Sequence, residues 1–288
     1  MRSNKDTGKK RAKIFLSFLL LTLFSAVAAV MAWKIADYLR DERTSLEYWE
    51  GLQDSVVIME SAAPPTKEAE PTSTPDTQTD LEPTPTPDTQ ADPEPTGPVI
   101  PKSIDFDSLH AVSADAVAWL FAPDMSINYP VAQSEDNAYY LRRLLDGTYA
   151  SGGSLFADYR CAPDFSDWNT VIYGHQMNDG TMFGELENYR DPAYYAEHPV
   201  MYLYIPGKRY TLELIAGYLT DVNDVAYALP TTKVLRDAIL TRAAMRSTFD
   251  SGITPDWSDK LVTLSTCAYD YDDARYVLIG RIIEDMSN

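Results

Sequence analysis

Residues 14–33, Ile-Phe-Leu-Ser-Phe-Leu-Leu-Leu-Thr-Leu-Phe-Ser-Ala-Val-Ala-Ala-Val-Met-Ala-Trp, form an apolar run without a single charge. A run of this length is about long enough to cross a bilayer as a helix. The preceding tail is rich in Lys and Arg and contains one acid, Asp6. Because positive charge is retained on the cytoplasmic side, the sequence predicts a cytoplasmic tail at 1–13, a transmembrane signal-anchor at 14–33 and an exported remainder.

A cleaved secretory signal is the alternative for this run. Ser25-Ala-Val-Ala-Ala offers small residues of the kind that a signal peptidase accepts. The apolar run is longer than the usual hydrophobic region of a signal peptide, which favours an uncleaved anchor. Both alternatives export everything after Trp33.

Two segments of different composition follow the apolar run. In 34–60, apolar residues such as Leu39, Leu46 and Trp49 recur at helical spacing, which is compatible with an outward continuation of the membrane helix. We expect a solvated juxtamembrane stalk. Residues 61–98 are rich in Pro, Thr, Asp and Glu, and Pro71–Gln78 is nearly duplicated at Pro83–Gln90. This composition cannot bury a core, so we predict a disordered linker that spaces a domain from the membrane.

Residues 99–288 are enough for one domain with a sizeable core. Helices are predicted at Ser113–Phe121, with Ser113 as the N-cap, within Ser134–Leu145, and at Thr232–Met245. Short β-rich segments separated by turn residues predict a mostly β domain, an antiparallel barrel or sandwich. The predicted strands are Ile127–Val131, Ser154–Ala157, Thr170–Tyr173, Val200–Ile205, Tyr210–Thr220, Leu261–Cys267 and Arg275–Arg281.

The charge and the cysteine count restrict the possible partners. The formal net charge of −19 and the lack of a basic stripe argue against nucleic acid. No pair of histidines has ligand spacing, and the Asp-rich turns lack the glycine-centred calcium pattern, so neither metal nor cofactor is predicted. The two cysteines, Cys161 in a predicted loop and Cys267 at a strand end, are expected to remain free thiols.

Three side chains at strand ends point to covalent chemistry. The segments ending at Cys267 and beginning at Arg275 are joined by a short acidic loop, so they are predicted to pair as a hairpin that places the two residues together. A neighbouring guanidinium favours the thiolate form of a cysteine. His175 follows the predicted strand Thr170–Tyr173. This combination predicts acyl transfer with a thiolate nucleophile and an imidazole that moves protons.

The chain resembles the sortases, and specifically their class B branch, over about Ile104–Ile283. The resemblance rests on Asp136-Asn-Ala-Tyr-Tyr-Leu141, on Ile172-Tyr-Gly-His175 continuing to Gly184, and on Thr263-Leu-Ser-Thr-Cys267 followed by Arg275-Tyr-Val-Leu-Ile-Gly-Arg281. The helix inside the β-region is similar to an insertion typical of class B. The resemblance implies a closed eight-stranded β-barrel with N-terminal helices and a helix inserted before the catalytic cysteine.

The resemblance also implies an activity and its residues. A thiolate attacks the threonine carbonyl of a sorting pentapeptide, of the Leu-Pro-x-Thr-Gly or Asn-Pro-x-Thr-Asn kind, and an amine of the cell wall resolves the thioester. Cys267 would be the nucleophile, His175 the acid and base, and Arg275 the oxyanion stabiliser. The positions implied to bind substrate are Asn137, Leu141, Tyr173, Ser265 and Tyr227. Arg281 is expected to be structural, and the acidic turn of Asp270, Asp272 and Asp273 to be solvated.

Three alternatives to cell-wall transfer remain open. A cysteine protease would pass the same acyl-enzyme to water, because hydrolysis and transfer differ only in the second nucleophile. A pilin-polymerising sortase would use a lysine of another protein. A non-catalytic surface module would only bind peptide or wall polymer. The expected partners are exported proteins with a C-terminal sorting motif and a peptidoglycan amine, and the expected location is the cell membrane with the catalytic domain outside.

Overall fold

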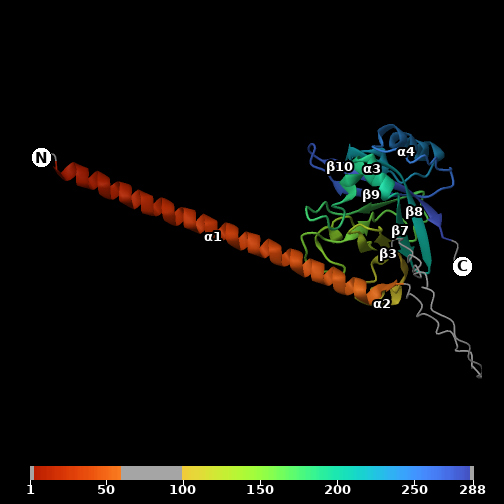
Figure 1. Cartoon of the computed structure of the whole chain (residues 1–288), viewed down its shortest axis with the longest axis horizontal. Helices are drawn as coiled ribbons and strands as arrows, with labels where there is room; N and C mark the ends of the chain where they lie inside the picture. Colours follow the sequence, from red (N-terminus) through yellow and green to blue (C-terminus); the bar gives the residue numbers. More distant parts are fainter. Residues whose placement is uncertain (1–2, 60–98, 286–288) are drawn as a thin grey trace, which may run out of the picture.

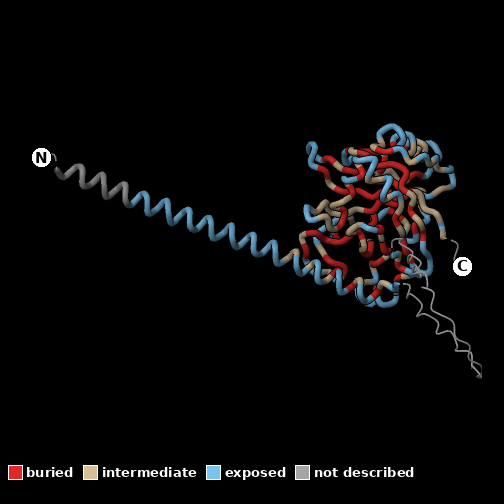
Figure 2. The backbone as a smooth tube through the Cα atoms, viewed as in Figure 1, coloured by how far each residue is buried: buried red, intermediate tan, exposed pale blue. Residues whose placement is uncertain are grey.

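The computed structural model of the chain describes residues 3–59 and 99–285, and their side chains from Phe15 onward. The N-terminal helix α1 (Ser3–Val56) extends away from a rounded domain (Figure 1). It contains an 18-residue window with a mean hydropathy of 2.4, none of it buried, which is long and apolar enough to cross a membrane. Figure 2 shows this stretch as exposed until the helix reaches the domain. The predicted linker 61–98 lies outside the described residues.

Eight strands close into a barrel, as the resemblance implied. Their order around the barrel is β10-β8-β7-β3-β4-β5-β6-β9, and a short β1–β2 pair lies beside it. The pairings β4–β5 and β6–β9 are parallel. The strands are β1 (Val57–Met59), β2 (Pro101–Ile104), β3 (Ala116–Phe121), β4 (Asn128–Ala132), β5 (Leu155–Ala157), β6 (Asn169–Tyr173), β7 (Val200–Ile205), β8 (Lys208–Asp221), β9 (Leu261–Cys267) and β10 (Ala274–Glu284).

Short helices connect the strands, and one longer helix covers the outside of the barrel. The helices are α2 (Phe106–Val112), α3 (Pro192–Glu197) and α4 (Lys233–Arg246), with 3₁₀ turns η1 (Tyr140–Arg142), η2 (Leu186–Arg190) and η3 (Val225–Tyr227). Helix α4 is the predicted insertion between β8 and β9, and Thr232 caps its N-terminus. Its buried face, Ile239 and Ala243, packs in a cluster with Tyr218 and Val277 of the neighbouring strands.

Two predicted helices in the first half of the domain are wrong. Ser113 is the C-cap of α2 rather than an N-cap, and residues 116–121 form β3. This segment pairs with β4 on one side and β7 on the other, so the N–H and C=O groups of its buried backbone are hydrogen-bonded as in a strand. Residues 134–145 contain only η1, because the Tyr140 carbonyl accepts from Ser154 N and the backbone bonds to another segment instead of to itself.

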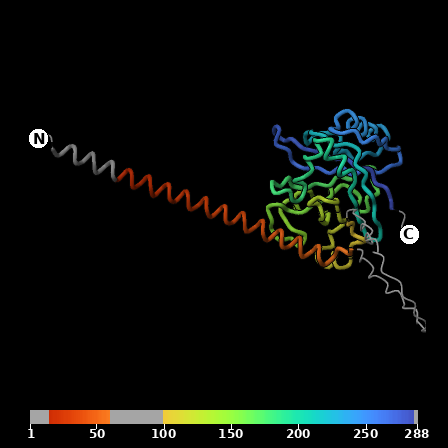
Figure 3. Tube along the Cα trace, in the orientation of Figure 1, coloured from red at the N-terminus to blue at the C-terminus, as the bar shows by residue number. Residues whose placement is uncertain are grey.

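The end of α1 is part of the domain, which differs from the expected solvated stalk at 34–60. Trp49, Leu52 and Val56 are buried in the main hydrophobic core. Trp49 packs edge-on against Tyr129 with ring centroids 5.6 Å apart, and Gln53 Nε2 donates to the Asn128 carbonyl at 2.7 Å. In Figure 3 the orange end of α1 lies against the yellow and green segments that follow residue 99. The helix is therefore attached to the barrel by apolar burial.

The β1–β2 pair contradicts the prediction that 61–98 separates the domain from the membrane. Val57 pairs with Ile104 and Met59 with Pro101, so the residues flanking 60–98 lie next to each other. A spacer must hold its ends apart. Because α1 itself enters the domain, the helix sets the distance from the apolar run to the barrel. Helix α1 already contacts the domain at Asp41, whose carboxylate accepts from the Ser151 N–H at 2.9 Å, so only residues 34–40, roughly 10 Å of helix, lie between the apolar run and the domain.

Replacing Trp49 by alanine is expected to destabilise a fragment that begins at Lys34. Truncating a buried tryptophan removes its transfer free energy and leaves a cavity, which costs about 3–5 kcal/mol. The free energy of unfolding by urea measures the effect. Glu50→Ala on the exposed side of the same helix is the control and should change stability by less than about 0.5 kcal/mol. Equal stability of the two variants would contradict the docking of α1.

Candidate active site

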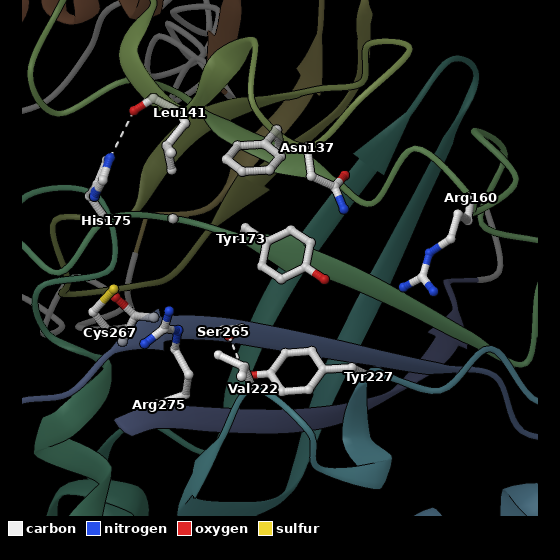
Figure 4. Close-up of a pocket in the computed structure, with 13 residues that line it drawn as sticks. Asn137, Leu141, Arg160, Tyr173, His175, Val222, Tyr227, Ser265, Cys267 and Arg275 are labelled. Carbon is white, nitrogen blue, oxygen red and sulfur yellow. Dashed lines mark hydrogen bonds between the residues drawn. The ribbon is translucent and has the colours of Figure 1, made fainter. Parts of the chain in front are cut away.

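A pocket of about 470 Å³ opens where β6, β9 and β10 meet, and it contains every residue that the sequence predicted as functional. It is lined by Asn137, Leu141, Phe156, Arg160, Tyr173, Gly174, His175, Val222, Tyr227, Ser265, Thr266, Cys267 and Arg275. Figure 4 shows the Cys267 sulfur between the imidazole of His175 and the guanidinium of Arg275.

Strand register places Cys267 beside Arg275. The two are direct partners in the antiparallel β9–β10 pairing, as the predicted hairpin required. The Arg275 guanidinium donates to the carbonyl of Ala274 at 2.9 Å. Among the described residues it makes no ion pair, and Asp270 of the acidic turn binds Arg190, with N–O distances of 2.6 and 2.9 Å. The Arg275 charge therefore remains available to the pocket.

The parallel β6–β9 pairing brings His175 level with Cys267. Tyr173 pairs with Ser265, and the Gly174 N–H donates to the Ser265 carbonyl at 3.1 Å. Two residues further along each strand stand His175 and Cys267. At Gly174 a Cβ would lie 2.5 Å from the Leu155 side chain and 2.6 Å from Phe183, so only glycine allows this close packing directly before His175.

A backbone carbonyl fixes the tautomer of His175. Its Nε2 lies 2.7 Å from the Leu141 oxygen, and a carbonyl only accepts, so Nε2 carries the proton and Nδ1 is left as the acid–base atom. The carbonyl is held by close backbone packing. Gly153 has a φ of +56°, and a Cβ there would lie 2.5 Å from the Leu141 oxygen. Glycine at position 153 thus allows the close approach of the Leu141 carbonyl, which orients the imidazole.

Burial lowers the pKa of His175, and the nearby Arg142 charge lowers it further, whereas the bond to Leu141 acts in the opposite direction. A lowered pKa means that the imidazole is neutral in most molecules at neutral pH. The unfolded chain then binds more protons than the folded one as the pH falls below about 6.5, the usual histidine pKa, so this group reduces stability in that range.

Replacing Arg142 by methionine is expected to move the acidic limb of the kcat/KM profile toward higher pH. The variant removes a positive charge that disfavours the imidazolium, so the pKa of His175 should rise. The pH dependence of peptide cleavage measures the shift, since kcat/KM reports ionisations of the free enzyme. Arg246→Met, on the exposed side of α4, is the matched control and should leave the profile in place.

Two aromatic rings line the pocket beyond Cys267. Tyr173 and Tyr227 are stacked, with centroids 6.3 Å apart and an interplanar angle of 11°. The Tyr227 hydroxyl and Ser265 Oγ are 2.8 Å apart, and burial raises the pKa of Tyr227 to about 12. With Leu141 and Asn137 these residues complete the predicted substrate-binding set. These residues lie in one pocket, and their role in substrate binding stays a prediction.

Arg160 and the acid beneath it were not predicted from the sequence. Asp158 is fully buried and forms two bonds of 2.8 Å with the Arg160 guanidinium. The same carboxylate accepts from Tyr173 Oη at 3.0 Å and Asn137 Nδ2 at 3.1 Å. The available signal was an Asp-x-Arg sequence directly after a predicted strand, in a segment that otherwise indicates only a loop around Cys161.

Cys161 is a free thiol like Cys267, but its surroundings differ. It is buried, and its sulfur contacts the Asn169 carbonyl at 3.9 Å. Burial raises the pKa of the Cys161 thiol to about 11. A thiol that stays protonated and enclosed is a poor nucleophile. The geometry thus separates a structural cysteine from the one in the pocket.

Comparison with known proteins agrees with this geometry. A family model described as Sortase domain matches residues 120–283. Sortase B of Listeria monocytogenes is 36% identical over 179 residues, which cover 61% of this chain and 72% of the relative. The structure of a Staphylococcus aureus sortase B–substrate complex matches with a TM-score of 0.59 and 29% identity, covering 62% and 84% of the two chains. A structure of sortase B complexed with triglycine matches with a TM-score of 0.59 and 30% identity, covering 62% and 85%.

Proposed function

Because this chain belongs to the sortase family of cysteine transpeptidases, in its class B branch, we propose that it cleaves a C-terminal sorting pentapeptide after threonine and transfers the acyl part to an amine of the cell wall. The observation that carries this proposal is the position of Cys267 in one pocket with His175 and Arg275. These three groups supply a nucleophile, a proton carrier and a permanent cation.

The reaction begins when the Cys267 thiol passes its proton to Nδ1 of His175 and the resulting thiolate attacks the threonine carbonyl carbon. The C=O π electrons move to oxygen, and the Arg275 guanidinium stabilises the resulting oxyanion. Collapse of this intermediate breaks the C–N bond, while His175 donates the proton from Nδ1 to the leaving amine. A thioester remains on Cys267. The incoming amine attacks this thioester and passes a proton to Nδ1 of His175. The C–S bond then breaks, which leaves the new amide, and the Cys267 thiolate takes the proton back from His175.

The amine acceptor is proposed from the surroundings of the pocket and from relatives. A sortase B has been solved in complex with triglycine, and the Staphylococcus aureus sortase B in complex with a substrate. We infer that a glycine-containing or similar cell-wall amine enters on the His175 side, where the leaving amine departs. Clients are then exported proteins that carry the sorting motif.

The apolar part of α1 supports a location at the cell membrane. Its 18-residue apolar window can cross a bilayer, and the basic N-terminal tail favours a cytoplasmic N-terminus. The barrel is attached to the same helix through Trp49, Leu52 and Val56. We therefore propose a single-pass protein whose active site lies outside the cell at a distance fixed by α1.

Intact-mass measurement tests the proposal directly. A fragment from Lys34 onward is mixed with peptides containing Asn-Pro-x-Thr-Asn or Leu-Pro-x-Thr-Gly, and the expected result is a mass increment equal to the acyl part on Cys267. Adding triglycine should convert this adduct into a peptide joined to the amine. An adduct that yields only the free acid in the presence of triglycine would support the cysteine-protease alternative instead.

A further inference from the structure

The proposed active site is lined by arginines on a strongly acidic protein. The chain has 43 acidic residues against 24 basic ones, yet the lining of the pocket includes two arginines and no carboxylate. Arg275 accounts for one of these charges, because it stands next to Cys267. Arg160 lies at the opposite end of the pocket, beyond the Tyr173 ring (Figure 4), where no step of the reaction needs it.

Arg160 is held in place by a built network. Asp158 fixes the guanidinium through Nε and one terminal nitrogen, and Tyr173 and Asn137 hold the same carboxylate. Because Asp158 is completely buried, it orients Arg160 while remaining out of reach of a peptide. The Arg160 side chain itself is 47% exposed. A guanidinium has five N–H donors, so most of its fork remains available on the pocket side.

The direction of the bound peptide follows from the proposed chemistry. His175 must reach the leaving nitrogen, so the leaving segment lies on the His175 side of Cys267. The acyl segment, on the N-terminal side of the threonine, must then continue away from His175. In that direction the pocket passes the rings of Tyr173 and Tyr227 and ends at Arg160 (Figure 4).

We propose that Arg160 forms a subsite for a carboxylate side chain of the acyl-donor peptide, N-terminal to the threonine that Cys267 attacks. This inference rests on the proposed transpeptidase function. A carboxylate matches the planar fork of arginine and makes stronger hydrogen bonds with it than a neutral amide does. The subsite would make the enzyme select sorting signals with an acidic residue at one position.

A paired peptide scan tests the subsite. Aspartate and its neutral counterpart asparagine are placed in turn at each position from the residue before the threonine back through the two residues before the motif, and kcat/KM is measured for each pair. At one position the wild-type chain is expected to prefer Asp by about tenfold, the range of a charge-assisted hydrogen bond at a partly exposed site. The preference should decrease as the salt concentration rises.

Variants then assign the preference to one side chain. Arg160→Gln, which can still donate to Asp158, should reduce the Asp/Asn ratio to about one, whereas Arg246→Gln on α4 should leave it at the wild-type value. Circular dichroism melting checks that each variant is folded. If Arg160→Gln does not fold, Arg160→Lys, which keeps the charge but lacks the planar fork, takes its place and should weaken the preference.

The outcomes separate the two proposals. Normal thioester formation with an Asp/Asn ratio of one at every position overturns the subsite but not the transpeptidase. If folded Arg160→Gln still prefers Asp to Asn, the subsite proposal is overturned as well. If no peptide forms a thioester with the wild-type chain, the proposed function itself fails.

Discussion

Replacing Cys267 by alanine is expected to abolish both the acyl adduct and peptide cleavage. Without sulfur the pocket has no group that can form the thioester, and loss of a nucleophile from an acyl-transfer site reduces kcat by about 10⁴-fold or more. Intact-mass measurement and chromatography of the peptide products check the two effects separately. A Cys267→Ala variant that still cleaves the peptide would show that the nucleophile has been assigned wrongly.

The second cysteine supplies the control for this experiment. Cys161→Ala is expected to retain activity, because that thiol is buried against the Asn169 carbonyl outside the pocket. A thiol-directed reagent at neutral pH should label Cys267 in the folded protein and leave Cys161 unmodified, since burial raises the pKa of the latter to about 11. Equal labelling of both cysteines would contradict the difference between their surroundings.

The site could be predicted from the sequence because strand ends determine it. The hairpin containing Leu261–Cys267 has a short loop and one consistent register, so the Cys267–Arg275 pairing follows from the local sequence. The parallel pairing of β6 with β9 is not local, since Asn169 and Leu261 are far apart in the chain. The strand-end positions suggested from the sequence that His175 acts together with Cys267, but the register that brings the two side chains level could not be read from the local sequence.

Other features depend on tertiary contacts that leave a weak sequence signal. The apolar run at 116–121 fits a helix or a buried strand equally well by periodicity, and its pairing with both β4 and β7 decides for the strand. Trp49, Leu52 and Val56 have ordinary helical spacing, which does not reveal whether their face meets solvent or a barrel. The Asp158–Arg160 pair was missed because it depends on the burial of Asp158, which composition does not show.

The β1–β2 pair has a consequence for how the enzyme meets its substrates. A domain on a long spacer would sample many heights above the membrane, whereas a domain packed on the end of a continuous helix is held at one height. Because Trp49 and Val56 lie in the same core as the barrel strands, rotation of α1 would turn the barrel with it. We therefore expect the pocket to keep a defined orientation toward the membrane surface.

Replacing Arg275 by lysine is expected to lower kcat by about 100- to 1000-fold, as for the loss of one oxyanion donor, with a much smaller change in KM. Lysine keeps the charge but lacks the planar fork, so it cannot hold the Ala274 carbonyl and the developing oxyanion in the same way. Arg281→Lys on the same strand is the matched control. Its guanidinium pairs with Glu213 at 2.6 Å and Asp259 at 3.4 Å and does not line the pocket, so kcat should stay within about twofold of the wild type. Steady-state kinetics with one sorting peptide compare the three proteins. Equal losses in the two variants would mean that Arg275 supports the strand rather than the transition state.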